Sequence, residues 1–229
     1  MRRSTATLGF LTAAAIAGLA CERTSSATPA SAAPPAMAAG TGVQPIVNGQ
    51  TDLSAAAKGA RPVTKADVDF MSGMIAHHAQ AVIMAGWAPS HKASASLQRY
   101  CERVVVGQSD EIRLMQQWLK DHGQPVPDAK DTRMHMTMNG KTMDMLMPGM
   151  LSDDEMKQLD QARGVEWDRL FLQGMIKHHG GAIDMVNTLN SSNGAAQDEF
   201  VFKLSNDIYA DQMTEITRMQ QMLAALPQK

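Results

Sequence analysis

The stretch "DFMSGMIAHHAQAVIMA", residues 69–85, carries two adjacent histidines, His77 and His78, within an apolar pattern. Its apolar residues and one histidine recur at spacings of three and four, which places them on one face of an α-helix: Phe70, Met74, His77, Ala81 and Met84. A near copy, "GMIKHH" at residues 174–179, lies in the second half of the chain. The recurrence predicts two helices that are copies of one another.

The similarity extends beyond the histidine pairs. Asp67 aligns with Asp168, and further along the chain Gln108 and Glu111 align with Gln212 and Glu215. We interpret this as a duplicated helical hairpin, with repeats at residues 64–123 and 165–226. Two such hairpins predict an all-α, four-helix bundle with pseudo-two-fold symmetry, the architecture in which facing side chains can build a metal site.

Local signals set the expected helix ends. Thr64 and Asp67 form a capping-box pattern, and Gly86 and Pro89 end the first helix. The other expected helices span about 92–122, 152–164, 165–189 and 195–225, with a connection over residues 124–164. No stretch predicts a strand.

The N-terminal region has the features of export. Residues 1–20 combine Arg2 and Arg3 with a short apolar run, which is typical of a signal peptide. Cys21 follows "AGLA" and is a candidate lipidation site, with ordinary cleavage as the alternative. Residues 21–62, rich in Ala, Ser, Thr, Pro and Gly, predict a disordered tether before a folded domain at 63–227. We therefore expect a periplasmic or cell-envelope protein that meets the membrane only through a lipid anchor.

Composition narrows the function classes. The formal net charge of −2 gives no reason to expect nucleic-acid binding. Aromatic residues make up 4% of the chain while there are 19 methionines, which favours helix packing. No nucleophile elbow, phosphate loop or paired-acid motif is present, so we expect no enzyme activity. We also expect Cys101 in the core, and His91 and His122 at the surface.

Each histidine pair lies one helical turn after a methionine. Thioether and imidazole together suit Cu(I) better than Mg²⁺, Ca²⁺ or structural Zn²⁺. The candidate helical ligands are Met74, His77, His78, Met84, Met175, His178, His179 and Met185. The competing interpretation is that these residues only fill the core, and a carboxylate contribution from the aligned acids stays open.

The connection supplies further candidate ligands. Residues 134–150, "MHMTMNGKTMDMLMPGM", hold seven methionines and one histidine. We predict that its first part captures copper, through Met134, His135, Met136 and Met138. The alternative is a hydrophobic strap in which methionines fill irregular gaps, and the later part, "MLMPGML", suits that role.

The segments "DVDFMSGMIAHHAQAVIMA" and "MPGMLSDDEMKQL" closely resemble the bacterial domain-of-unknown-function 305 family, as does "WDRLFLQGMIKHHGGAIDM". That family includes CopM-type copper-binding proteins. The resemblance covers about residues 64–226 and implies a ferritin-like four-helix bundle, export, and copper binding through Met and His. The matching positions are the eight helical candidates named above.

The favoured function is an exported copper-binding protein that sequesters Cu(I), with Ag(I) or Cu(II) as further ions, or passes it to a transporter or chaperone. One alternative is a ferritin-like metal-dependent oxidase. Another is a structural or partner-binding bundle whose histidines have no metal role.

Overall fold

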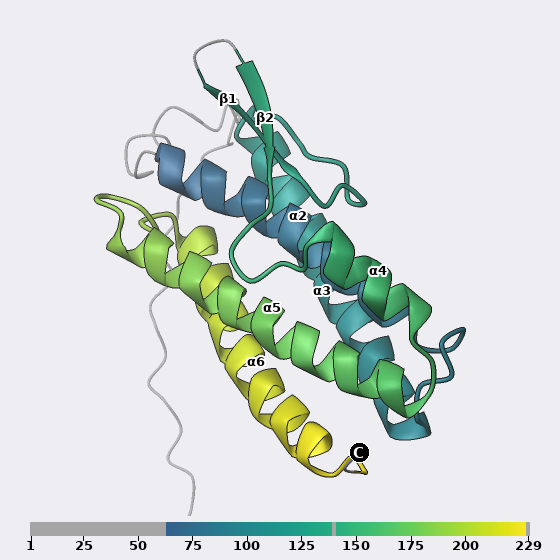
Figure 1. Ribbon diagram of the computed structural model, residues 1–229. Coiled ribbons are helices and arrows are strands. Elements are labelled where there is room, and N and C mark those ends of the chain that lie inside the picture. Colours follow the sequence, from purple (N-terminus) through teal and green to yellow (C-terminus); the bar gives the residue numbers. More distant parts are fainter. Residues whose placement is uncertain (1–62, 139–140, 228–229) are drawn as a thin grey trace, which may run out of the picture. The chain divides into compact units, whose positions relative to one another are not determined.

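A computed structural model describes residues 63–138 and 141–227 (Figure 1). Its long helices are α2 (Lys65–Gly86), α3 (Ala95–Asp121), α5 (Val165–Ser191) and α6 (Glu199–Ala224), with a short α4 (Asp153–Gln161). The predicted helical bundle is confirmed. No described helix has the length and apolar character needed to cross a membrane. The signal peptide, Cys21 and the tether lie outside the described residues and stay predictions.

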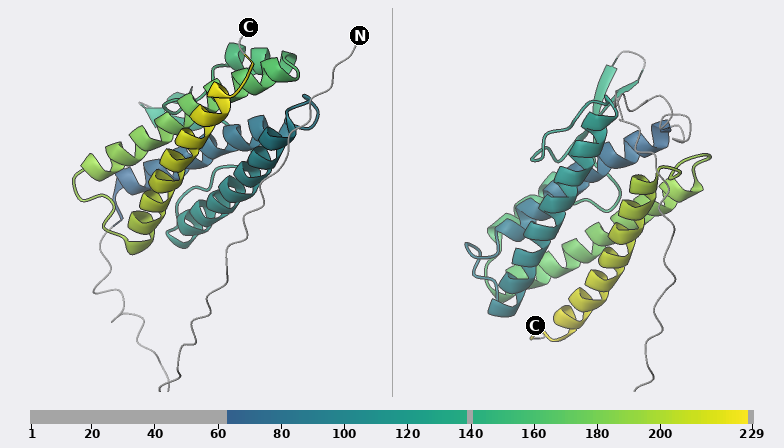
Figure 2. Two further views of the ribbon diagram at one scale, coloured as in Figure 1. Left: turned by 90° about the horizontal axis from the view of Figure 1, so that it is seen from below. Right: turned by 180° about the vertical axis from the view of Figure 1, so that it is seen from behind.

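The helices pair as the duplication predicts. Helix α2 packs along α3, α5 packs along α6, and α2 meets α5 between the two hairpins (Figures 1 and 2). The first half of α2 shares a hydrophobic cluster with the second half of α5, so these two helices run in opposite directions. Both copies of the histidine stretch therefore lie on the helices that face each other across the two halves.

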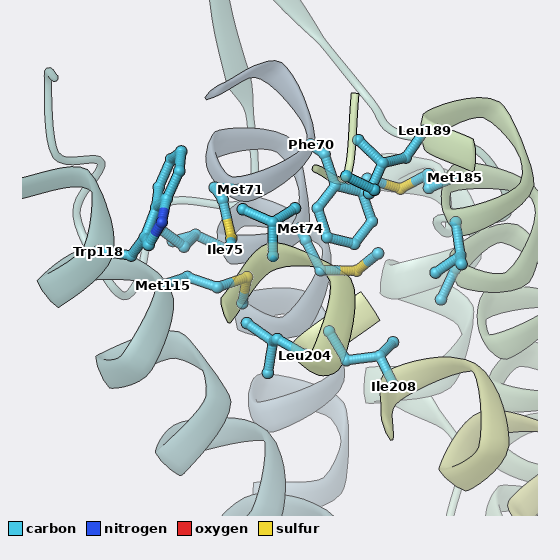
Figure 3. Close-up of a cluster of buried hydrophobic side chains, with 14 of the residues drawn as sticks. Phe70, Met71, Met74, Ile75, Met115, Trp118, Met185, Leu189, Leu204 and Ile208 are labelled. Atoms are coloured by element: carbon cyan, nitrogen blue, oxygen red, sulfur yellow. The ribbon is translucent and has the colours of Figure 1, made fainter. Parts of the chain in front are cut away.

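Two hydrophobic clusters fill the bundle. The first core cluster, shown in Figure 3, joins the start of α2 to the ends of α3 and α5 and to the start of α6. It contains Phe70, Met74, Ile75, Met115 and Met185. The second core cluster lies toward the other ends of the same four helices and contains Met84, Cys101, Trp167, Phe171 and Met175. The histidine pairs lie between these clusters along α2 and α5.

Reciprocal hydrogen bonds join the two halves. The Asp67 carboxylate accepts from the backbone N–H of Ala196, in the turn before α6, at 2.7 Å. Asp168 accepts from the backbone N–H of Ser94, in the turn before α3, at 3.2 Å. Both aspartates are 1% exposed. Each half thus closes the turn of the other, which explains why these acids are present in both copies.

Helices α3 and α6 begin three or four residues later than predicted. The turns before them contain Lys92 and Ala196, which both have positive φ angles, 58° and 53°. Left-handed backbone cannot continue a right-handed helix. In α6 the side chain of Asp198 then accepts from the N–H of Val201 at 3.0 Å and caps the helix.

A β-hairpin in the connection corrects the expectation of no strands. Strands β1 (Met134–Met138) and β2 (Lys141–Met145) pair antiparallel, with Met134 opposite Met145 and Met136 opposite Met143. The alternating pattern "MHMTM…KTMDM" around Asn139-Gly140 is a hairpin signature, because Asn-Gly favours a two-residue turn. The methionine alternation thus reflects strand geometry as well as composition.

Residues 147–151, named here the strap, cross the bundle against α5. Gly149 has a φ of 74°, and a methyl group on Gly181 would lie 1.9 Å from the Pro148 carbonyl oxygen. Gln80 of α2 holds the other end by bonding both the N–H and the carbonyl of Leu151, at 2.8 and 2.9 Å. Met150 and Leu151 are buried, as expected for a hydrophobic strap.

Candidate metal centre

The four paired histidines form a buried polar layer in the middle of the bundle. His77 and His78 of α2 and His178 and His179 of α5 are all 0% exposed. The ring centroids of His77 and His178 are 3.7 Å apart, with 40° between the ring planes. We name these four residues, together with buried Gln108 and Gln212, the histidine layer.

Three of the histidines have a defined tautomer because an acceptor holds one nitrogen. His78 Nε2 lies 2.8 Å from the Glu111 carboxylate, and His179 Nε2 lies 2.6 Å from that of Glu215. His77 Nε2 lies 3.1 Å from the carbonyl oxygen of Pro148. Since these oxygens accept, each Nε2 donates, and in the neutral form of such a ring Nδ1 carries the lone pair. Metal-binding histidines are commonly oriented in this way.

The remaining ring nitrogens of the four histidines have no hydrogen-bond partner. Nδ1 of His77, His78 and His179 is unpartnered, and so are both ring nitrogens of His178. The side chains of Gln108 and Gln212 contribute three further unpartnered atoms. Buried polar atoms normally find partners, because leaving one unsatisfied costs about 1–3 kcal/mol. Their concentration at one level of the described bundle calls for a ligand or a functional role.

Burial favours the neutral form of His77, His178 and His179. Desolvation lowers the pKa of both His77 and His178 well below the usual range, and the neighbouring histidines lower it further. Burial likewise lowers the pKa of His179, although the Glu215 carboxylate acts in the opposite direction. Neutral imidazole is the form of histidine that binds metals.

The helical methionines flank the histidine layer on both sides. Met74, Met84 and Met175 are fully buried, and Met185 is 9% exposed. Met74 and Met185 share the first core cluster, whereas Met84 and Met175 share the second. The structure therefore pairs methionines from opposite halves, where the sequence suggested one set of donors within each half.

The core offers nitrogen and sulfur donors. Within residues 63–138 and 141–227, no group of three or more His, Cys, Asp or Glu side chains is arranged to hold a metal ion. Asp67 and Asp168 bond backbone N–H groups, and Glu111 and Glu215 bond histidines. Imidazole with thioether is a donor set that fits a soft ion such as Cu(I).

The candidate ligands of the connection are divided. His135 is half-exposed on β1, and its two nitrogens lie 2.6 Å from Asp131 and 2.7 Å from Asp144. These hydrogen bonds raise its pKa. Met134 instead reaches the bundle and approaches Gly73 of α2. Met136 and Met138 belong to β1, and their side chains lie outside the described part of the chain.

Three other predictions have clear outcomes. The expectation that His91 is a surface residue is wrong, because it is 4% exposed and its ring bonds the backbone carbonyls of Trp87 and Asp160. His122 is exposed, as predicted. Cys101 is buried in the second core cluster, and burial raises the pKa of its thiol to about 12, so it behaves as a core residue.

Sequence reasoning missed Gln108, Gln212 and Pro148 as members of this centre. The two glutamines precede Glu111 and Glu215 by one helical turn, so each lies on the face that meets the histidines. Their alignment in the repeat was the available signal. The role of Pro148 depends on a backbone carbonyl, which no residue type reveals.

The chain belongs to the family described as "Domain of unknown function (DUF305)", whose model matches residues 67–223. A search of curated proteins found no match.

Solved structures show the same fold. A DUF305 protein of Streptomyces coelicolor, classed as secreted, is 28% identical with a TM-score of 0.58, over 69% of this chain and 92% of that one. A DUF305 fragment from Deinococcus radiodurans is 25% identical with a TM-score of 0.59, over 72% and 99%. CopM in its Cu(I)-bound form is 25% identical with a TM-score of 0.51, over 68% and 94%.

Proposed function

We propose that this protein is an exported copper-binding protein that holds Cu(I) through the histidine layer and the methionines beside it. The observation that carries the proposal is the set of five buried imidazole nitrogens without partners. The ligands are drawn from His77, His78, His178 and His179, with Met74, Met84, Met175 and Met185 as the sulfur donors. Sequestration or delivery to a transporter or chaperone would follow, without catalysis.

The surroundings of the layer suit this role. Glu111 and Glu215 fix the ring orientation of one histidine in each pair. The lowered pKa values of His77, His178 and His179 favour neutral rings, which need not release a proton before binding. Thioethers favour Cu(I) and the chemically similar Ag(I), while imidazoles also accept Cu(II). His135, which is half-exposed on the hairpin, would make the first contact with the ion, and Met136 and Met138 of the same strand are further candidates from the sequence.

The comparisons support the choice of ion. CopM, a similar structure, has been solved with Cu(I), Cu(II) and Ag bound. Export is supported by the signal-like residues 1–20 and by the similar structure from Streptomyces coelicolor, which is described as a "putative secreted protein". Lipidation at Cys21 is part of the proposal, and mass spectrometry of the protein purified from membranes would detect the added mass.

A Cu(I) competition titration tests the proposal. Replacing all four paired histidines with Ala should abolish at least one equivalent of tightly bound Cu(I). His122→Ala is the matched control, since His122 is exposed and away from the layer, and it should bind as the unmodified protein does. Unchanged stoichiometry and affinity in the four-histidine variant would rule out the layer as a copper site.

Thermal melts provide an independent readout of the same binding. A metal that binds only the native state raises its stability, by about 2.7 kcal/mol when the free ion is at 100 times its Kd. Cu(I) and Ag(I) should therefore raise the melting temperature of the unmodified protein and of His122→Ala. A bundle with a purely structural or partner-binding role would show no shift with either ion.

A further inference from the structure

Three methionines from separate segments converge on Gly73 of α2. A methyl group on Gly73 would lie 2.8 Å from Met147 Sδ, 3.3 Å from Met134 Sδ and 3.4 Å from Met185 Cε. These residues come from the strap, from β1 and from α5. For Met147 and Met134 the atom nearest to the added methyl group is the sulfur, and for Met185 it is the terminal carbon Cε. Gly73 therefore leaves a space that faces thioethers.

The other half of the molecule provides an internal comparison. Gly174 is the counterpart of Gly73 in the repeat, and a methyl group there would meet only the hydrocarbon side chain of Leu151, at 3.1 Å. Neither glycine has a positive φ, so neither is required by the backbone. A glycine within a helix costs about 0.5–1 kcal/mol relative to Ala. At Gly73 the absence of a side chain allows the sulfurs of Met147 and Met134 to lie close to the helix backbone.

A fourth nearby methionine has a different role. Met150 Sδ accepts the backbone N–H of Met147 at 3.2 Å, so its sulfur is already engaged within the strap. This contact fixes the backbone from which Met147 reaches Gly73. Met150 is thus a positioning residue.

The space beside Gly73 adjoins an open cavity. Met134, Met147 and Met185 line a cavity of about 300 Å³, together with Phe70, Pro148 and Asp69 at the start of α2. Oxygen atoms also line this cavity: the Asp69 carboxylate pairs with Lys65 at 2.7 Å, and the hydroxyls of Thr188 and Ser192 donate to backbone carbonyls at 2.8 Å. Pro148 also accepts from His77 Nε2, so the cavity borders the histidine layer.

We propose that Met134, Met147 and Met185 form a second site, built only from thioethers, for a soft monovalent cation of the Cu(I) and Ag(I) class. This assigns Met185 to the second site and leaves Met74, Met84 and Met175 as the sulfur donors beside the histidine layer. The site lies beside the cavity, about one turn of α2 from His77. This proposal depends on the proposed function only for which ion the site binds in the cell. Because its three ligands are all thioethers, it favours Cu(I) over Cu(II).

The test is a titration with Ag(I), which is redox-inert here, monitored by competition with a chromophoric chelator. Met134→Leu, Met147→Leu and Met185→Leu in one variant should lower the affinity for one Ag(I) equivalent at least tenfold. Leu nearly conserves volume, so the fold should persist, and circular dichroism checks this. The matched control is Met143→Leu with Met145→Leu, two exposed methionines of the same hairpin, and it should bind normally.

A second variant removes the space and keeps every sulfur. Gly73→Ala would place a methyl group against Met147 Sδ and should also lower that affinity at least tenfold. Gly107→Ala is its control, because nothing lies within 4 Å of the added methyl group. Normal Ag(I) binding by both the triple-Leu variant and Gly73→Ala would overturn the thioether site.

The four-histidine variant separates this site from the proposed function. It should retain the Ag(I) equivalent, and X-ray absorption should show sulfur neighbours alone around the silver. Loss of that equivalent, or a nitrogen or oxygen neighbour, would overturn the second site. Unchanged Cu(I) binding by the same variant would instead contradict the histidine layer and leave the thioether result standing.

Discussion

His178 is the residue most at odds with an ordinary core. It is fully buried, both its ring nitrogens lack partners, and its ring lies against that of His77. Its counterpart, His77, at least bonds the Pro148 carbonyl. Without a metal, His178 must therefore reduce the stability of the bundle. A residue retained at such a cost serves binding better than it serves folding.

Replacing His178 with Leu should consequently stabilise the metal-free protein while weakening copper binding. Removing a buried, unsatisfied polar group should raise the free energy of unfolding by about 1–3 kcal/mol. Urea unfolding of the metal-free protein measures the first effect, and the Cu(I) titration measures the second. His122→Leu serves as the control and should not raise stability. A metal-free His178→Leu protein that is less stable than its parent would refute this account.

At this scale the sequence could predict which residues lie in the core but not their hydrogen-bond partners. The repeat and the helical spacing placed the four histidines and the four helical methionines on the faces that are buried, and their metal role stays a prediction. Which nitrogen is free depends on Glu111, Glu215 and a backbone carbonyl of Pro148, and these meet the histidines only after folding. The burial of His91 was missed for the same reason, because its carbonyl partner on Asp160 is distant in sequence.

Among the elements, the strap is the part that breaks the symmetry of the duplication. It lies on Gly181 and is held by Gln80, two residues that occupy the same position in the two repeats. In the second repeat, Gly181 leaves room for the strap because it has no side chain. In the first repeat, the side-chain amide of Gln80 binds the strap. The two repeats thus differ at this position because the strap makes a different contact with each of them.

Substituting Gly181 with Ala should therefore destabilise the protein. The added methyl group would lie 1.9 Å from the Pro148 oxygen, so the strap or α5 would have to shift, at a cost of about 1–3 kcal/mol. Gly180→Ala is a closely matched control, because nothing lies within 4 Å and Ala favours the helix by about 0.5–1 kcal/mol. In chemical denaturation, the free energy of unfolding should be higher than that of the parent for Gly180→Ala and lower for Gly181→Ala. The reverse order would be inconsistent with the observed strap contact.

The elements were largely predictable, and the exceptions have physical causes. Caps such as Thr64 with Asp67 fixed the start of α2 to the residue. The hairpin was missed because its methionines were interpreted by their chemistry, although Asn139-Gly140 and the alternation around it were available. The left-handed turns at Lys92 and Ala196 have no residue signature, since neither is Gly or Asn.

For the molecule as a whole, the buried histidines predict acid sensitivity. Unfolding restores the pKa of His77, His178 and His179 to about 6.5 from lower folded values. Between the folded and unfolded pKa values the unfolded chain binds more protons, so stability falls as the pH drops below about 6.5. The slope should approach about 1.4 kcal/mol per pH unit for each histidine. His135, whose pKa is raised, acts with the opposite sign, but it is exposed and screened by solvent.

Urea unfolding of the metal-free protein at pH 7.5, 6.5 and 5.5 measures this dependence. Replacing the four paired histidines with Leu should flatten the profile over that range, which assigns the effect to the layer. A metal-free parent whose stability is constant or rises toward pH 5.5 would show that the histidines are protonated in the fold.

The reciprocal contacts of Asp67 and Asp168 bear on how such a chain could evolve. Two separate hairpins that complete each other's turns have the arrangement of a symmetric homodimer, in which every contact occurs twice. In a homodimer, one gene sets both copies of each position. Joining the copies in one chain removes that restriction, so Gln80 and Gly181 could diverge and a single strap could cover one side. A covalent fusion of this kind would allow two equivalent histidine pairs to acquire different surroundings.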